Sequence, residues 1–220
     1  MDICNLSGDN LSGDFRITDL KQGVRNPERV NVYVNGKFSF SLDVSQVVEL
    51  GVKVGLEISV EELVALKKAS EFGKLYQRAL EWVLLRPHSE RECRDYLRKK
   101  IFEKKLDNDF VDKIIEKLKA KKYIDDDKFA EWYVQNRFLK KGVSAKRLGI
   151  ELMKKGISKE TAHEAIVRSE RNDRDEILKI IAKKRTKYAD DKKLMAYLCR
   201  QGFDYQLVRD LVAESSLAAE

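Results

Sequence analysis

One pattern of residues occurs three times in the C-terminal two thirds of this chain, and this repetition restricts the fold more than any other feature. When residues 148–166 are shifted by 46 positions, apolar residues and one Gly coincide. The coinciding pairs are Leu148 with Leu194, Leu152 with Leu198, Gly156 with Gly202, Ile157 with Phe203, Ala162 with Val208, Ala165 with Leu211 and Ile166 with Val212. An earlier copy aligns at offsets of 55 and 51, which a four-residue insertion within Ile101–Lys105 reconciles. Its matching residues are Cys93, Leu97, Leu106, Val111, Ile114 and Ile115.

Each copy is predicted to be a unit of three short helices. The first helix of each unit is expected ahead of the two repeated helices, at Leu75–Leu85, Phe129–Leu139 and Glu176–Lys187. Apolar residues at helical spacing give each helix one face to bury, so neighbouring units are expected to pack on each other. Gly156 and Gly202 suit the left-handed position that ends a helix, and Ser158 and Asp204 can cap the next one.

The N-terminal quarter shows the alternation typical of β-strands. Within Arg29–Asp43, apolar and polar residues alternate on both sides of Asn35-Gly36, a pair suited to a type I′ turn because both positions need positive φ. The run Phe15–Leu20 alternates as well and predicts a third strand. Further on, Ser59 with Glu62 and Ser89 with Glu92 have capping-box spacing, so helices are expected to begin there.

These patterns predict a mainly α fold: three tandem three-helix repeats forming an elongated, curved molecule, preceded by a β-hairpin or three-stranded β module. The expected segments are residues 1–13, flexible; 14–58, the β module; 59–73, a connecting helix; 74–122, 123–170 and 171–216, the three repeats. Trp82 and Trp132 fall at a common place in the first helices, and core packing is favoured there over stacking on bases.

The charge lies on the predicted helical part. The chain carries 44 Lys and Arg against 37 Asp and Glu, but residues 1–58 hold six bases and eight acids. The net charge of the rest is therefore +9, which suggests an affinity for polyanions. The three cysteines are far apart and are expected to be free thiols. With no secretory signal and no apolar run of membrane-spanning length, the expected location is the cytoplasm.

The repeat alignment concentrates part of that charge in two columns of basic residues. Arg91, Lys146 and Lys192 form column one, and Lys99, Lys154 and Arg200 form column two. With 44 Lys and Arg among 220 residues, chance makes roughly one aligned column in a hundred wholly basic. The two columns indicate a periodic series of positive points that phosphates or acidic protein surfaces could bind. A structural alternative stays open, because exposed helix positions favour Lys and Arg and shared descent would copy them.

Further candidate binding residues lie beside the columns. They are Arg94 and Arg98 in the first repeat, Arg147 and Lys155 in the second, and Lys183, Lys184 and Arg185 in the third. Lys140 and Lys141 add a smaller cluster before Gly142. For all of these a solvated helix face is the alternative interpretation.

No catalytic or metal-binding motif is found. The sequence lacks a P-loop, a His-Glu-x-x-His motif and a Gly-x-Ser-x-Gly motif, and its two histidines, His88 and His163, are far apart. The acid pair Asp125 and Asp126 is better explained as a helix cap than as a Mg²⁺ site. We therefore expect no enzymatic activity, no cofactor and no metal.

Two segments make the chain similar to a known family. Lys122–Glu131, with the sequence KYIDDDKFAE, is followed by Lys146–Leu148 and Leu152–Ile157, and together they closely resemble the RecX family of bacterial regulators of the recombinase RecA. Arg25–Val30 and the hairpin resemble the N-terminal β extension of many members. The insertion within Ile101–Lys105 departs from the tight Gly-containing turn usual in the family.

This resemblance implies a non-enzymatic protein of recombination, DNA repair and the SOS response. Such a protein docks in the groove of the RecA–single-stranded-DNA filament, modulates and mostly inhibits its ATPase and strand exchange, contacts DNA without sequence specificity, does not bind membranes and is a monomer. Two alternatives remain. Lys146–Arg168 resembles a helix-turn-helix, which predicts sequence-specific duplex binding. A nuclease is disfavoured by the absence of catalytic motifs.

Overall fold

The computed structural model describes residues 15–24, 26–138 and 141–217. These described residues divide into two compact units, one up to residue 78 and one from residue 79 onward. The boundary between the units falls inside helix α2 (Val60–Leu84). The predicted flexibility of residues 1–13, the thiol of Cys4 and the basic residue Lys140 lie outside the described residues.

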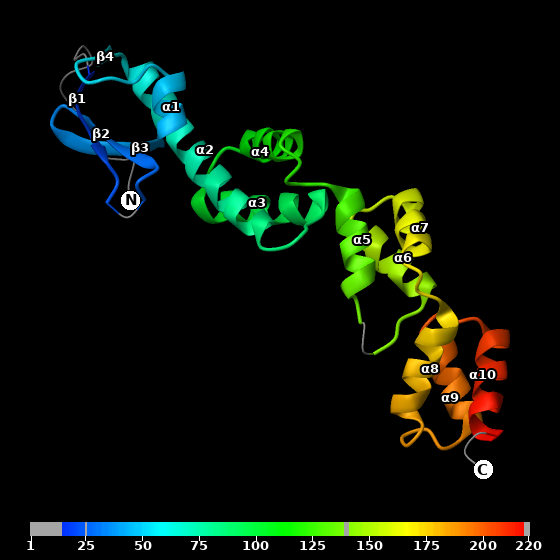
Figure 1. Ribbon diagram of the computed structural model, residues 1–220. Helices are drawn as coiled ribbons and strands as arrows, with labels where there is room; N and C mark the ends of the chain where they lie inside the picture. Colours follow the sequence, from blue (N-terminus) through cyan, green and yellow to red (C-terminus); the bar gives the residue numbers. More distant parts are fainter. Residues whose placement is uncertain (1–14, 25, 139–140, 218–220) are drawn as a thin grey trace. The chain divides into compact units, whose positions relative to one another are not determined.

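The first unit contains a four-stranded antiparallel sheet, of which β1, β2 and β3 are blue and β4 is cyan in Figure 1. Its strands are β1 (Phe15–Gln22), β2 (Arg29–Val34), β3 (Lys37–Asp43) and β4 (Glu57–Ile58), in the order β3-β2-β1-β4. Asn35 and Gly36 both have positive φ, 49° and 79°, as the predicted hairpin turn requires. The predicted strands are confirmed, but the sheet has four strands because Glu57 and Ile58 pair with the start of β1.

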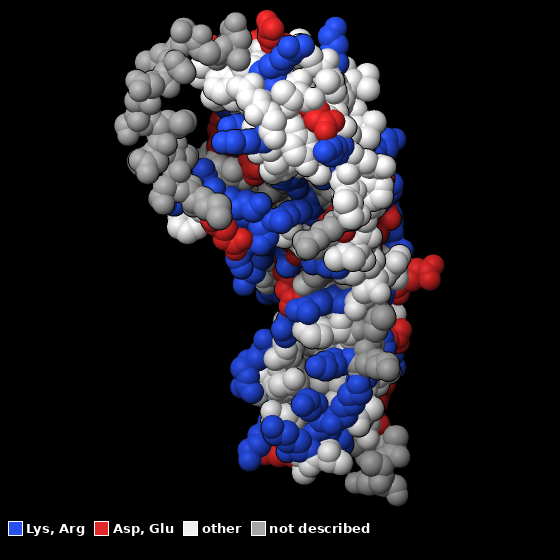
Figure 2. Space-filling model, turned by 90° about the vertical axis from the view of Figure 1, so that its left-hand side faces the viewer, with Lys and Arg blue, Asp and Glu red and all other residues white. Residues whose placement is uncertain are grey.

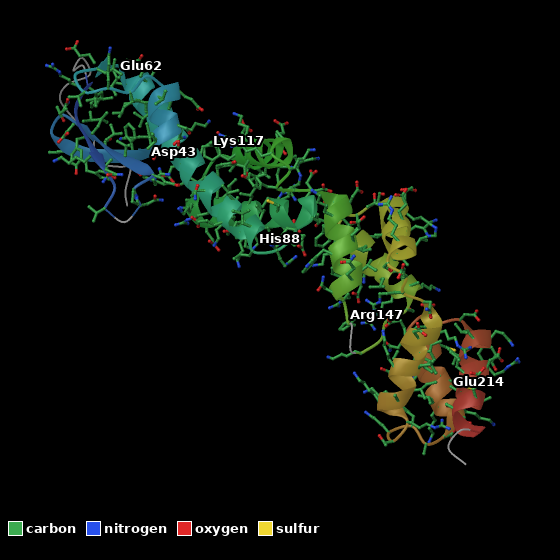
Figure 3. All side chains as sticks on the ribbon, in the orientation of Figure 1. Asp43, Glu62, His88, Lys117, Arg147 and Glu214 are labelled. Carbon is green, nitrogen blue, oxygen red and sulfur yellow. The ribbon has the colours of Figure 1, made fainter. Side chains whose placement is uncertain are left out.

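One face of the sheet carries the core of this unit. Ile17, Val32 and Leu42 are fully buried there, against Leu63 and Leu66 of α2. A short helix, α1 (Val44–Glu49), follows β3. At the start of α2, where Glu62 is labelled in Figure 3, the Ser59 hydroxyl accepts a hydrogen bond from the Glu62 amide. The Glu62 carboxylate accepts one from the Ser59 amide, so the predicted capping box is confirmed. The helix then runs unbroken to Leu84, where the sequence suggested two helices.

The second unit consists of helical repeats, in green to red in Figure 1. Helices α3 (Glu90–Lys104) and α4 (Asp109–Ala120) follow the end of α2; α5 (Asp126–Asn136), α6 (Ala145–Lys154) and α7 (Lys159–Arg168) form the next repeat; α8 (Asp173–Lys184), α9 (Asp191–Arg200) and α10 (Tyr205–Leu217) form the last. Trp82 is half-buried and stacks on His88 and Tyr96, with ring centroids 3.5 and 4.5 Å away. The mainly α architecture with a β module is therefore confirmed.

Burial follows the repeat pattern. The aligned residues Cys93, Leu148 and Leu194 are each at most 1% exposed, and so are Leu97, Leu152 and Leu198 one helical turn later. The insertion within Ile101–Lys105 lengthens α3 to 15 residues, against 10 each for α6 and α9. Lys105 ends this longer helix in the left-handed conformation, φ 53°, that Gly156 and Gly202 adopt near the ends of α6 and α9.

The same two hydrogen bonds join each repeat to the next. The hydroxyls of Ser89 and Ser144, both completely buried, donate to the carbonyls of Lys155 and Gln201 at 2.7 and 2.8 Å. The amides that follow these serines, those of Glu90 and Ala145, donate to the carboxylates of Asp126 and Asp173, each at 2.8 Å. The first repeat therefore packs on the second with the same geometry as the second packs on the third. The residue aligned with the serines in the third repeat is Asp190, whose carboxylate accepts but does not donate.

Gly202 lies against one of these docking serines, which gives a prediction. Gly202 has φ 96°, and a Cβ there would lie 2.8 Å from the Ser144 hydroxyl, so Gly202→Ala should destabilise the protein by roughly 1–3 kcal/mol. Gly149 lies inside α6, where a Cβ would meet nothing closer than 3.8 Å. Gly149→Ala should instead stabilise the helix by up to about 1 kcal/mol. Urea unfolding measures both changes, and a loss of stability in both variants would contradict the docking role.

Candidate nucleic-acid interface

Column one lies at the same place in three helices. Arg91, Lys146 and Lys192 are the second residues of α3, α6 and α9, and all three are exposed. Within the described part of the chain, none of their side chains forms a hydrogen bond or an ion pair. A cation near a helix N-terminus opposes the helix dipole by about 0.3–1 kcal/mol, so helix stability does not explain this column.

Column two has a structural explanation in two repeats. Lys154 and Arg200 are the last residues of α6 and α9, where a positive charge interacts favourably with the helix dipole. Lys99 does not share that position, because α3 continues to Lys104. All three side chains are exposed, so they add to the positive surface, but column one is the more informative of the two.

Several other candidate residues are engaged within the protein. Arg94 pairs with Glu90 and Asp112 at 2.8 and 2.5 Å, and Lys155 pairs with Glu92 at 2.5 Å. The remaining pairs are Arg98 with Asp95, Arg147 with Glu151 and Arg185 with Asp191. These bases support the repeats as well as the surface charge, which separates them from the two columns.

The third repeat presents a positive surface. On the face drawn in Figure 2, Lys and Arg cover much of the lower part, the level at which Figure 1 places α8, α9 and α10, with few acids among them. Lys183 is exposed and Lys184 is half-buried near the end of α8, and column residues Lys192 and Arg200 lie on α9.

Two carboxylates hold several of these bases: Glu92 joins the first repeat to Lys155 of the second, and Glu151 binds bases within the second repeat. Burial raises the pKa of Glu92, but hydrogen bonds from His88, Lys155 and Arg86 outweigh this effect and lower the pKa to about 2. Burial likewise raises the pKa of Glu151, and hydrogen bonds from Arg137, Tyr133 and Arg147 lower it to about 2. Glu92 therefore does not complete the predicted capping box at Ser89, although the Ser89 hydroxyl does accept the Glu92 amide.

These carboxylates predict acid sensitivity. Because their folded pKa values lie below the ordinary 4.5, the stability they provide is complete above about pH 4.5 and is lost as the pH falls toward 2. The full loss amounts to roughly 3 kcal/mol for each carboxylate. Urea unfolding at pH 6 and pH 3 should show a smaller difference for Glu92→Gln/Glu151→Gln than for the unmodified protein. An equal difference would show that these two groups do not carry the pH dependence.

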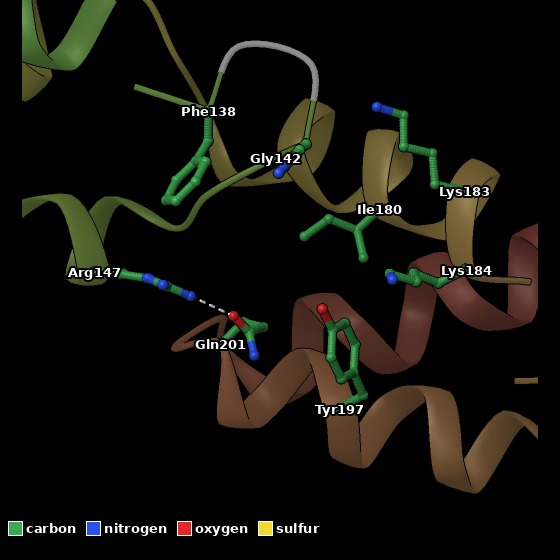
Figure 4. A pocket seen from close by; sticks show the side chains of 9 residues that line it. Phe138, Gly142, Arg147, Ile180, Lys183, Lys184, Tyr197 and Gln201 are labelled. Atoms are coloured by element: carbon green, nitrogen blue, oxygen red, sulfur yellow. Dashed lines mark hydrogen bonds between the residues drawn. The ribbon is translucent and has the colours of Figure 1, made fainter. Parts of the chain in front are cut away.

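A cavity of about 420 Å³ lies between the second and third repeats, and sequence reasoning did not identify it. Figure 4 shows Arg147 of α6 donating a hydrogen bond to Gln201, the residue that follows α9, at the edge of the cavity, with Phe138 above and Tyr197 below. Lys184, chosen from the sequence for its charge alone, also lines this cavity. Phe138 and Tyr197 had no sequence signal, because they lie outside the aligned apolar positions.

The described residues hold no group of three or more His, Cys, Asp or Glu side chains placed to bind a metal. None of the helices that the structure describes combines the length and the apolar composition needed to cross a bilayer. The buried thiol of Cys93 has a pKa raised to about 12, chiefly by burial, so it is a poor nucleophile.

Comparison with known proteins relates the chain to one family. Residues 15–59 match the family model for the regulatory protein RecX N-terminal domain, and residues 125–166 match that for the second three-helix domain of RecX. The regulatory protein RecX of Clostridium perfringens strain SM101 is 30% identical over 206 residues, covering 90% of this chain and 94% of that protein. The regulatory protein RecX of Bacillus velezensis is 31% identical over 194 residues, covering 88% and 71%.

Solved structures share the fold. A crystal structure of a regulatory protein RecX matches with a TM-score of 0.73 at 21% identity, over 90% of this chain and 98% of that one. The crystal structure of RecX from Lactobacillus salivarius matches with a TM-score of 0.55 at 25% identity, over 68% and 99%. From these identities, the matching domains and the shared repeats, we conclude that the chain belongs to the RecX family of regulatory proteins, which is not a family of enzymes.

Proposed function

We propose that this protein docks in the groove of a RecA–single-stranded-DNA filament and modulates, in most conditions inhibits, ATP hydrolysis and strand exchange. The family supports RecA as the partner, since modulation of RecA is its known role. Column one is the observation that carries the proposal. An exposed basic residue occurs at the second position of α3, α6 and α9, and within the described residues its side chain forms no ion pair. The helix dipole disfavours a positive charge at this position, so helix stability does not explain its recurrence.

A filament is a periodic polyanion, and a periodic series of cations suits it. Two of the three repeats dock on the next one by the same hydrogen bonds, so the column is held in a regular arrangement rather than on loops. Because phosphate contacts carry no sequence information, binding is expected to be independent of base sequence. We further expect a monomeric cytoplasmic protein that acts without a cofactor.

The proposal is tested with the host recombinase. Increasing amounts of the protein should lower the rate of ATP hydrolysis by the recombinase on single-stranded DNA, up to a stoichiometric ratio. An unchanged rate at saturating protein would refute it.

The helix-turn-helix alternative finds less support. Its recognition helix would be α7, whose exposed side chains include Glu160 and Glu164. The exposed Arg168 of that helix pairs with Glu131 and Glu164 at 3.2 and 3.0 Å. Acids that face the phosphates oppose insertion into the major groove, so sequence-specific duplex binding is not favoured.

A further inference from the structure

The cavity between the second and third repeats combines positive charge with an aromatic wall. Among the described residues that line it, Lys141, Arg147, Lys183 and Lys184 are basic and none is acidic. Its volume of about 420 Å³ lies within the range of small-molecule sites. A ligand that fits this lining is anionic at one end and apolar at the other.

The guanidinium of Arg147 is held in place at the edge of the cavity. It donates one hydrogen bond to the Glu151 carboxylate at 3.0 Å and another to the Gln201 side chain at 2.5 Å. Lys184 enters from α8, across the cavity from Arg147 (Figure 4). The side chain of Lys184 forms no hydrogen bond or ion pair within the described part of the chain, so its ammonium can turn to a bound anion. These bases provide both a fixed and an adjustable contact for a phosphate.

The aromatic wall is held in an unusual conformation. Phe138 has φ 49°, a left-handed conformation that costs a residue other than Gly about 1–3 kcal/mol and persists only where its surroundings impose it. The guanidinium of Arg137 lies 3.7 Å from the centroid of its ring, and that of Arg147 lies 5.5 Å away. Figure 4 shows the ring directed toward the cavity.

The opposite wall supplies a polar group that has no partner. Tyr197 stacks on Tyr188 with ring centroids 5.2 Å apart, and its hydroxyl points into the cavity in Figure 4. Within the described residues that hydroxyl forms no hydrogen bond, and neither does the side-chain nitrogen Nε2 of Gln201, whose Oε1 accepts from Arg147. Both groups can pair with the polar edge of a base.

We propose that this cavity binds one nucleotide of a single nucleic-acid strand, with its phosphate between Arg147 and Lys184 and its base against Phe138. A duplex cannot offer this ligand, because its bases are stacked and paired inside the helix. The same chemistry occurs in a free nucleotide, which the test separates from a strand. The inference deepens the proposed function, since the filament contains a single strand.

The test uses fluorescence anisotropy of a labelled oligothymidylate with the full chain. Phe138→Leu keeps the charge and most of the packing but removes the stacking surface, so affinity for the strand should fall about tenfold. Phe102→Leu is the matched control, because Phe102 is 86% exposed and lies outside the cavity, and it should leave affinity unchanged. Lys184→Gln, which does not alter the aromatic wall, should also weaken binding by several-fold. Equal affinities of Phe138→Leu, Lys184→Gln and the unmodified protein would overturn the site.

Competitors identify the source of the ligand. Displacement by unlabelled strand but not by the matching duplex supports a nucleotide within a strand, and displacement by thymidine monophosphate at low concentration supports a free nucleotide in the same site. Displacement by a short Asp/Glu peptide but by neither nucleotide would overturn the inference. Photocrosslinking of an iododeoxyuridine oligonucleotide should label Phe138 or Tyr197, and labels found only elsewhere would also overturn it.

The failure of this inference is distinguishable from the failure of the proposed function. If Phe138→Leu binds the strand normally and still inhibits the recombinase, the cavity is not the nucleotide site while the proposed function stands. If the unmodified protein binds the strand through the cavity but does not slow the recombinase, the site stands and the proposed function fails.

Discussion

Charge reversal of Lys146, Lys154, Lys192 and Arg200 to Glu should weaken binding to the recombinase filament by at least about 100-fold at low salt. The change removes four cations and introduces four anions on α6 and α9. The slope of log affinity against log salt should fall in magnitude by about 4 if all four contact phosphates. Inhibition of ATP hydrolysis at stoichiometric protein should be lost with the binding.

Stability should change little in this variant. All four residues are exposed, and Glu favours the N-terminal positions 146 and 192 as much as it disfavours the C-terminal positions 154 and 200. The matched control reverses Lys113, Lys121, Lys159 and Lys193, which are exposed and outside both columns. Thermal unfolding monitors the fold, and filament co-sedimentation monitors the binding. Equal loss of binding in both variants would show that only net charge matters, and no loss in either would remove the columns from the mechanism.

Glu176→Gln should destabilise the protein by roughly 3–5 kcal/mol, because the largely buried guanidinium of Arg171 would lose its negatively charged partner. Glu176 is 2% exposed and accepts hydrogen bonds from Arg171 at 2.9 Å, the Val143 amide at 2.9 Å and Lys179 at 2.7 Å. Arg171 in turn donates hydrogen bonds to the carbonyls of Val134 and Arg137, at the C-terminal end of α5, at 2.6 and 2.7 Å. The network therefore links the second repeat to the third, and its loss should lower the stability of both repeats.

The chain offers a matched control for this substitution. Glu214 pairs with Arg174 at 2.9 Å, the same N–O distance, but the two side chains are 57% and 55% exposed. Glu214→Gln should cost no more than about 0.5 kcal/mol, since exposed pairs contribute little. Urea unfolding at pH 7 compares the two variants. A similar, small effect for both would contradict the importance of the buried network.

The repeated helices were predictable because burial imposes the same residue at the same helical position in each unit. Leu148 and Leu194 align in sequence because each is buried in the hydrophobic core of its repeat. The type I′ turn at Asn35 and Gly36 was predictable from local chemistry alone. Strand β4 was not predictable, because its two residues, Glu57 and Ile58, are too few to show an alternating pattern. They form a strand only because the tertiary fold brings them beside β1.

The candidate site was predictable only in part. Column one could be found by alignment, but its opposition to the helix dipole needed the true start of each helix. The ion pair of Arg147 with Glu151 has the i,i+4 spacing of a helix and was predictable, but its second hydrogen bond is to Gln201, 54 positions away. Lys155 pairs with Glu92, 63 positions away, and sequence spacing does not relate these two residues. The cavity beside Phe138 arises where two repeats meet, so no single repeat contains its pattern.

A reconstruction of the recombinase–single-stranded-DNA filament with the protein bound would show directly which surface of the repeats binds the filament. We expect the N-terminal ends of α3, α6 and α9, which carry Arg91, Lys146 and Lys192, to face the filament groove. Density that places these three residues toward solvent, with another surface of the repeats in the groove, would contradict it.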